Sequence, residues 1–233
     1  MPKHGKAYEK AVELVDGDTT YSIEQAVELV KSTSTTKFDA WVDIVIVTGL
    51  DTRHADQQLR GALSLPHGTG KTVKVAVFAR GDKEKEALEA GADIVGTDEL
   101  AEEIKNGRLD FDMVLATPDM MKIVGGLGRV LGPRGMMPNP KTGTVTNDIG
   151  AAVAEYKAGK VNFKAASDGL IQSKIGRVSF EPEKLQENIK AFMAHIVKNR
   201  PSGARGQYIK KVVISSTMGP GIRIDFKDLS EGV

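Results

Sequence analysis

The segment VKVAVFARGDKEKEALEAGADIVGTDELAEEIKNGRLDFDMVLATP, residues 73–118, alternates three apolar runs with two highly charged runs. The apolar runs have the length and composition of buried strands, and the charged runs have those of helices. Each charged run ends at a glycine, Gly91 or Gly107, as is expected where a helix terminates in the left-handed conformation. Repeated strand, helix, strand order predicts a parallel sheet that helices cover.

The segment before this block has a different pattern. Residues 21–31, YSIEQAVELVK, predict a helix in which Ser22 is the cap and Gln25 completes a capping box. After a polar linker, residues 38–48, FDAWVDIVIVT, predict a strand with alternating sides. One side of that strand is entirely apolar, so we expect it to face a core: Ala40, Val42, Ile44 and Ile46.

The carboxyl-terminal flank also combines strands with a helix. Residues 160–166 and 169–180 predict a hairpin about the SDG turn, and residues 181–201 predict a helix with a buried apolar stripe. Residues 208–216 and 221–226 predict two more strands. This arrangement favours a domain built from both ends of the chain, into which the central block is inserted.

Composition excludes several classes of site. The 233 residues include no cysteine, which removes disulfides, thiolate nucleophiles and cysteine zinc sites. The four histidines share no metal-ligand spacing, so we expect no metal, and none is placed to activate a nucleophile, so we predict no catalytic residue. No apolar stretch reaches the roughly 18 residues of a membrane-spanning helix, and the first ten residues lack the centre of a signal peptide. A cytoplasmic protein is expected.

The formal net charge of +1 conceals an uneven distribution along the chain. Residues 1–67 carry a net charge of −3, residues 68–159 carry −2, and residues 160–233 carry +6. A basic last third indicates an anionic partner. Residues 120–147 are also locally basic, because they include four cations and no acidic side chain: Lys122, Arg129, Arg134 and Lys141.

Two glycine-rich motifs resemble nucleotide loops without matching them. In LPHGTGKT, Gly70, Lys71 and Thr72 match the end of a P-loop, but Leu65 replaces its first glycine and a strand is predicted to follow instead of a helix. An interdomain connection is therefore favoured, and a P-loop-like nucleotide-binding α/β enzyme is the alternative. In GGLGRVLGPRG, residues 125–135, the dinucleotide spacing fails as well. That segment is either a plain surface loop or one whose arginines contact phosphates.

Two short stretches place an apolar side chain beside polar ones. In TKFDA, Lys37 and Phe38 open a predicted strand, which suits contact with a phosphate and with a sugar or base. In SSTMGPG, residues 215–221, Met218 lies in a turn between two predicted strands. Residue chemistry alone favours a core position for both apolar side chains.

Several longer motifs together resemble the ribosomal protein L1 family. They occur in the family's order and span nearly the whole chain: KFDAWVDIVIVTGLD, DQQLRGALSLPHGTGK, EAGADIVG, ATPDMM, LGRVLGPRGMMPNPKTGTV, PEKLQENIKAF and STMGPGIRID. The resemblance implies an α/β fold of two domains. A split α+β RNA-binding domain comprises residues 1–67 plus 160–233, and a Rossmann-like three-layer αβα domain, residues 68–159, is inserted through hinges near residues 66–70 and Gly159.

The resemblance also implies a function. A family member is a structural constituent of the large ribosomal subunit, with other subunit components as neighbours, and a monomer when free. It binds 23S rRNA at the mobile L1 stalk, assists release of deacylated tRNA from the E site, and represses translation by binding its own operon mRNA. Such a protein is not an enzyme, needs no cofactor, has no membrane partner and works in the cytoplasm on the ribosome.

Position by position, the resemblance assigns RNA contacts to two motifs of this chain. The Lys-Phe motif is Lys37 and Phe38, and the Thr-Met-Gly motif is Thr217, Met218 and Gly219. Charge and placement make Lys160, Lys164 and Arg223 further candidates for phosphate contacts, and Glu28 and Ser216 are also candidate RNA contacts. Where relatives have an Asp-Lys-Xaa-Gly hairpin and a histidine, this chain has Ala166, Ser167 and Gln172, and no contact is transferred to that hairpin.

Overall fold

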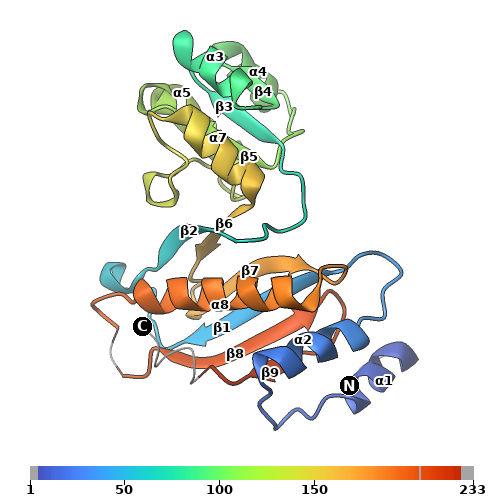
Figure 1. Cartoon of the computed structure of the whole chain (residues 1–233). Helices are drawn as coiled ribbons and strands as arrows, with labels where there is room; N and C mark the ends of the chain where they lie inside the picture. The colour runs from blue at the N-terminus through green and yellow to red at the C-terminus, as the bar shows by residue number, and fades with distance from the viewer. Residues whose placement is uncertain (1–4, 205, 227–233) are drawn as a thin grey trace. The chain divides into compact units, whose positions relative to one another are not determined.

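The computed structural model describes residues 5–204 and 206–226 (Figure 1). The chain forms two compact units, of which the first consists of residues 1–70 and 161–233 and the second of residues 71–160. Both units mix helices with sheets, which confirms the predicted α/β class. In the described part of the chain, no helix is both long and apolar enough to cross a membrane.

A four-stranded antiparallel sheet forms the framework of the first unit, in the order β7-β1-β8-β9 (Figure 1). The central strand comes from the amino-terminal flank and is hydrogen-bonded on both sides to strands of the carboxyl-terminal flank. The two ends of the chain are thereby joined in one sheet. The strand bounds are Trp41–Thr48 (β1), Leu170–Arg177 (β7), Ile209–Ser216 (β8) and Ile222–Ile224 (β9).

Two helices cover one face of this sheet, α2 (Ile23–Ser32) and α8 (Pro182–Lys198). The predicted capping box is present, since Ser22 Oγ accepts from Gln25 N and the Gln25 side chain accepts from Ser22 N. The apolar side of β1 is completely buried against the helices, as predicted. Each buried aliphatic side chain contributes about 1.5–3 kcal/mol relative to exposure. The stripe predicted for α8 is buried too: Leu185, Ile189, Phe192 and Ile196.

The predicted hairpin of residues 160–180 forms only next to its SDG turn, where Ala165 bridges Ile171, Ala166 N donates to Leu170 O at 2.8 Å and Gly169 N donates to Ala166 O at 3.0 Å. Strand β6 (Lys160–Lys164) itself pairs with β2 (Arg60–Ser64) instead of β7, so the prediction is wrong for the strand. The reason is the buried Phe163, whose ring packs edge-on against Phe192 at 5.9 Å and His195 at 5.5 Å. This contact holds β6 against α8. Two further short helices of this unit had no predicted counterpart: α1 (Lys6–Glu13) and η1 (Ala55–Gln57).

The second unit contains the parallel sheet that residues 73–118 predict, in the order β4-β3-β5. Side chains of β3 alternate between two cores, so that Val75 and Val77 pack with α3 and α7, and Ala76 and Phe78 pack with α4, α5 and α6. The unit therefore has three layers. Its elements are β3 (Val75–Phe78), α3 (Asp82–Glu89), β4 (Ile94–Gly96), α4 (Asp98–Lys105), β5 (Met113–Ala116), η2 (Pro118–Met120), α5 (Met121–Gly125), α6 (Gly128–Leu131), η3 (Pro140–Thr142) and α7 (Ile149–Ala158).

The P-loop alternative is contradicted by this arrangement. Strand β3 follows Thr72 where a phosphate-binding loop would open a helix. The Lys71 ammonium group is paired with the Asp112 carboxylate, so it is not free for a phosphate. Lys71 and Asp112 instead join two segments of the second unit.

Residues 67–70 of the connection between the two units are fixed to the first unit, mainly by the buried side-chain amide of Asn188. Asn188 of α8 is fully buried, and its Nδ2 donates to Gly68 O at 3.0 Å and Ile175 O at 2.8 Å. Its Oδ1 accepts from His67 N at 3.2 Å. The Arg177 guanidinium adds a bond to Gly70 O at 3.3 Å. The connection is therefore part of the first unit as far as Gly70.

Replacing Asn188 by leucine removes this anchor at nearly constant volume. Two carbonyls and one amide lose their partners, so we expect the free energy of unfolding to fall by about 2 kcal/mol or more. Urea unfolding followed by circular dichroism measures it. The exposed Lys190→Leu on the same helix is the matched control, with an expected change within about 0.5 kcal/mol. Equal effects of the two substitutions would contradict the anchoring role.

His195 makes the first unit sensitive to acid. Burial lowers the pKa of His195 below its ordinary value of 6.5, and the charge of Lys198 lowers this pKa further. The unfolded chain then binds the proton more readily, so stability falls as the pH drops through 6.5 toward the lower folded pKa. Unfolding measured between pH 7.5 and about 5 should show this loss. His195→Gln should flatten the profile in that window, and an unchanged profile would assign the loss to other groups.

Candidate nucleic-acid interface

The turn between β8 and β9 presents Met218 to solvent. Gly219 N donates to Ser216 O at 2.8 Å, which closes a four-residue turn. Met218 has a φ of 68°, and among the described residues it is the only non-glycine residue with positive φ. This left-handed conformation is unfavourable for a residue with a Cβ. The Met218 side chain is 75% exposed, so it is held outside the core.

Thr217 fixes the turn to the sheet. Its backbone N donates to Trp41 O at 2.9 Å, and its Oγ1 accepts from Trp41 N at 3.1 Å. These bonds continue the β1–β8 pairing one residue beyond Val42 and Ser216. Because the hydroxyl is already occupied by Trp41, the role that the geometry supports for Thr217 is to position Met218.

Ser216 and Gly219 form the underside of the turn. Ser216 is only 3% exposed, and among the described residues its Oγ is one of two buried side-chain polar atoms without a hydrogen-bond partner. A Cβ on Gly219 would lie 2.2 Å from this Oγ, far closer than any normal contact. The requirement for glycine is therefore internal to the turn. The side chain of Ser216 is covered and is not available to a partner.

A second exposed segment, Lys37 and Phe38, lies at the same end of the sheet. Phe38 is 59% exposed, and Lys37 is exposed without an ion pair in the described part of the chain. The following Asp39 anchors them, since its carboxylate accepts from Ser179 N at 3.1 Å and Ser179 Oγ at 2.9 Å. Phe38 precedes β1 by three residues and Met218 follows β8 by two. Because β1 and β8 are antiparallel neighbours, the start of β1 lies beside the end of β8. Both apolar side chains therefore lie at the same end of these strands, which we call the edge.

Trp41 carries two cations beside this edge. The Lys174 ammonium lies 4.8 Å and the Arg177 guanidinium 4.2 Å from the centre of the indole ring. The indole ring attracts both cations, and the Arg177 guanidinium also lies 3.7 Å from the Asp39 carboxylate. Arg177 also donates to Asp39 O at 3.1 Å, which links it to the segment with Phe38. On the same strand side, burial raises the pKa of Asp43, while the charge of Lys174 opposes this rise.

Two of the remaining predicted residues lie on the first unit near these strands. Glu28 is exposed on α2. Arg223 is half-buried on β9, where it pairs with Val213 of β8 and alternates with two buried isoleucines. Arg223 therefore faces away from the helices, on the same side of the sheet as Trp41. In the described part of the chain, neither side chain forms a hydrogen bond or an ion pair with the exposed segments.

Lys164 and Lys160 are placed differently. Lys164 is exposed at the end of β6, next to the bridge between Ala165 and Ile171. Ile171 pairs with Ile46, which lies five residues or about 17 Å along β1 from Trp41, so Lys164 is near the other end of this strand. Lys160 belongs to the second unit, where its ammonium pairs with Glu155 at 2.5 Å and lies 5.3 Å from the Tyr156 ring centre. The structure does not gather these two lysines with the edge residues.

Sequence reasoning missed the residues that hold the edge in place. Asp39, Trp41, Arg177 and Ser179 were not singled out, although Asp39 and Trp41 lie within four residues of Lys37. The only tryptophan of the chain, next to a strand start, was a signal that could have been used. Arg177 and Ser179 gave no such signal, because only the β1–β7 register brings them to Asp39 and Trp41.

The basic segment of the second unit, residues 120–147, is more than a surface loop, since Lys122 lies in α5, Arg129 in α6 and Lys141 in η3. Its end returns to β5, where Ala116 N donates to Thr144 O at 3.0 Å and Thr146 N donates to Ala116 O at 3.2 Å. All four of its cations are exposed, and within the described ranges none forms an ion pair: Lys122, Arg129, Arg134 and Lys141. No cluster of three metal-binding side chains occurs among the described residues.

Comparison with known proteins finds similarity along nearly the whole chain. The family model described as "Ribosomal protein L1p/L10e family" matches residues 30–220. A relative from Fervidobacterium nodosum, named "Large ribosomal subunit protein uL1", is 54% identical over 233 residues. The alignment covers 100% of this chain and 99% of the relative. Similarity therefore extends over both units.

The contact between Ser216 and Gly219 predicts non-additive substitutions. Gly219→Ala should lower the free energy of unfolding by about 1–3 kcal/mol, because the new methyl group meets Ser216 Oγ. Ser216→Ala should be close to neutral, because its hydroxyl has no partner to lose. The double variant should regain most of the stability, as measured by urea unfolding of all four proteins. Strict additivity would show that the clash is not the cause.

Proposed function

This chain belongs to the ribosomal protein L1p/L10e family, and we propose that its first unit binds 23S rRNA at the mobile L1 stalk. The chain is a non-enzymatic component of the large ribosomal subunit, which works in the cytoplasm. The proposed contact edge comprises Lys37, Phe38, Thr217, Met218 and Gly219. Glu28 and Arg223 flank it in this proposal. Ser216 supports the edge from below, whereas Lys160 and Lys164 are left out of it.

The observation that carries the proposal is the exposure of two large apolar side chains at one end of the sheet. Met218 and Phe38 are 75% and 59% exposed, and the Met218 backbone is held in an unfavourable conformation. A soluble protein gains nothing in stability from such an arrangement. Apolar and aromatic side chains at an RNA interface pack on bases and sugars, which compensates for their exposure in the free protein.

Polar groups around the edge suit the RNA backbone. Lys37 forms no ion pair with any described residue, and Lys174 and Arg177 both lie over the Trp41 ring. Arg177 has one carboxylate at 3.7 Å, that of Asp39. Cations of this kind attract phosphates over a distance and give RNA affinity that falls with salt.

We also propose the family's two further roles for this chain. An mRNA that copies the stalk fold would meet the same edge, so repression of the chain's own operon requires no second site. For release of deacylated tRNA from the E site, the exposed cations of the basic segment at residues 120–147 are suitable phosphate contacts. Both roles use groups that the described structure leaves free of ion pairs.

Truncating the two apolar side chains tests the proposal. Met218→Ala and Phe38→Ala should each weaken binding to a stalk-type rRNA fragment by about 1–3 kcal/mol, because each removes a stacking or apolar contact. Thermal unfolding should change little, since both side chains are exposed. Filter binding or fluorescence anisotropy at several salt concentrations measures the affinity.

Leu88→Ala is the matched control, because Leu88 is an equally exposed apolar residue, at 58%, on α3 of the second unit. Its rRNA affinity should equal that of the unmodified chain. Normal affinity of both edge variants would disprove the proposed contact edge. Loss of stability with normal affinity would instead assign Met218 and Phe38 to packing.

A further inference from the structure

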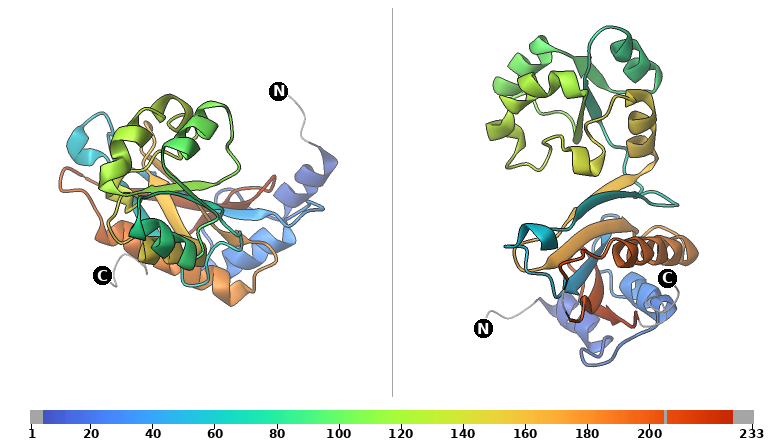
Figure 2. Two further views of the ribbon diagram at one scale, coloured as in Figure 1. Left: turned by 90° about the horizontal axis from the view of Figure 1, so that it is seen from above. Right: turned by 90° about the vertical axis from the view of Figure 1, so that its left-hand side faces the viewer.

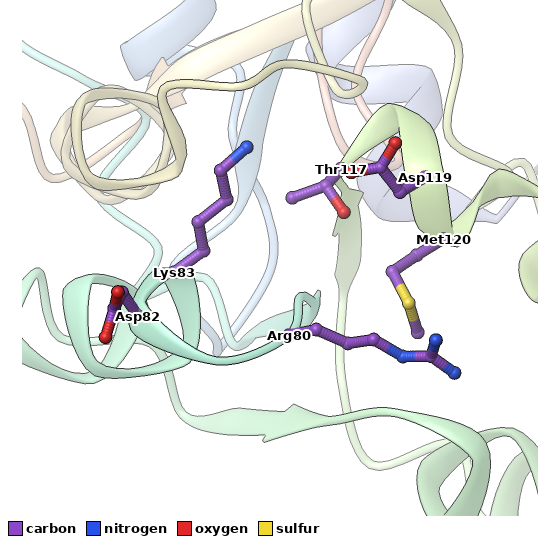
Figure 3. A pocket seen from close by; sticks show the side chains of 6 residues that line it. All are labelled: Arg80, Asp82, Lys83, Thr117, Asp119 and Met120. Atoms are coloured by element: carbon purple, nitrogen blue, oxygen red, sulfur yellow. The ribbon is translucent and has the colours of Figure 1, made fainter.

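The second unit has a pocket at the carboxyl edge of its parallel sheet. In the order β4-β3-β5, the chain forms the central strand β3 first and then β4 on one side of it. It then crosses to the other side of β3 to form β5. Ligands of open α/β sheets bind where the strand order reverses in this way, outside the carboxyl ends of the strands. Here that place lies between the ends of β3 and β5 and contains a pocket of about 280 Å³ (Figure 3). Its lining is Arg80, Asp82, Lys83, Thr117, Asp119 and Met120.

The floor of the pocket contains Thr117, which lines it at the end of β5. Thr117 is only 2% exposed, and its backbone N donates to Phe78 O at 3.0 Å, which fixes it at the end of β5. Its Oγ1 has no hydrogen bond within the described residues, and Figure 3 shows this oxygen directed into the space between the other side chains. A hydroxyl without a protein partner that opens into a pocket hydrogen-bonds to a water or a ligand there.

Backbone geometry adds hydrogen-bond donors on the opposite side. The turn from β3 into α3 passes through Gly81, which has a φ of 64° and open space where a Cβ would be. Gly81 is the N-cap of α3 and offers no side chain to the first amides of the helix. Those amides and the helix dipole favour an anion. Thr117 and this uncapped helix end face the same pocket from two elements.

Among the charged side chains that line the pocket, Lys83 is the cation available to a ligand. Lys83 forms no ion pair in the described structure, and its Nζ donates only to Asn147 Oδ1 at 3.2 Å. Arg80 pairs with Asp98 at 3.0 Å, although both side chains are more than 60% exposed. Of the two carboxylates, Asp82 points away from the other lining side chains, whereas Asp119 lies beside Thr117 (Figure 3).

We propose that this pocket binds the phosphate group of a small phosphate monoester. A monoester phosphate carries nearly two charges, which suits Lys83 together with the amide-rich end of α3. Thr117 Oγ1 supplies a further hydrogen bond from the floor. The volume of about 280 Å³ lies below that of sites for drug-sized ligands, so the ligand is the size of a sugar phosphate. This site is independent of the rRNA edge on the first unit.

NMR spectroscopy of the full, ¹⁵N-labelled chain tests the proposal with ribose 5-phosphate as the probe. Saturable shifts are expected at the amides of Gly81, Asp82, Lys83 and Thr117, and ribose without phosphate should cause none. Lys83→Gln and Thr117→Val should each weaken the affinity about tenfold, because each loses a hydrogen bond to a charged group. Lys85→Gln is the matched control on the same helix, outside the pocket, and should leave the affinity unchanged.

Several results would overturn the proposal. Absence of saturable shifts, or an equal loss of affinity in Lys85→Gln and Lys83→Gln, would show that no specific phosphate site exists. Shifts at these amides caused by an RNA oligonucleotide but not by ribose 5-phosphate would make the pocket an RNA contact. The well-dispersed spectrum of each variant verifies its fold, and unchanged affinity of Lys83→Gln for the rRNA fragment verifies that the two sites are separate.

Discussion

The pairing of β1 with strands on both of its sides is the constraint on which the first unit depends. Residues from the two ends of the chain are hydrogen-bonded in one sheet, and the second unit is formed by the residues between them in sequence (Figure 2). The same register places Trp41 beside Thr217 and Arg177. Two exposed segments about 180 residues apart in sequence, Lys37–Phe38 and the turn at Met218, thereby share one edge. Removing this pairing would leave neither the split domain nor the candidate interface.

Within that edge, the residues that stabilise the fold are different from the residues that are exposed. Its lower layer is mostly hydrogen-bonded, because the Asp39 carboxylate accepts from Ser179 and Thr217 bonds with Trp41, whereas Ser216 Oγ has no partner among the described residues. Its upper layer consists of Phe38 and Met218, whose side chains remain mostly exposed and contribute little to the free energy of folding. A rigid support reduces the conformational entropy that binding would otherwise cost. Such a support lets a small apolar surface contribute to affinity without rearrangement.

The second unit follows a different plan, in which one short sheet separates two cores. Alternation along β3 supplies both cores, so no face of that strand remains for a partner. Exposed functional groups are therefore confined to the ends of strands and to the loops that follow them. The hydroxyl of Thr117, the uncapped start of α3 and the basic segment that returns to Ala116 all lie after the carboxyl ends of β3 and β5.

Local pattern determined the elements of this protein. Periodicity predicted β1, α2, α8 and the parallel strands, because burial of one side of a helix or strand leaves its period in the sequence. Motifs placed Lys37, Phe38 and Met218 among the candidate residues, although residue chemistry alone favoured a core position for Phe38 and Met218. Tertiary structure decided what depends on partners distant in sequence. The pairing of β6 with β2, the support of the edge by Arg177 and Ser179, and the outward direction of Met218 arise from register and long-range packing, which no local period encodes.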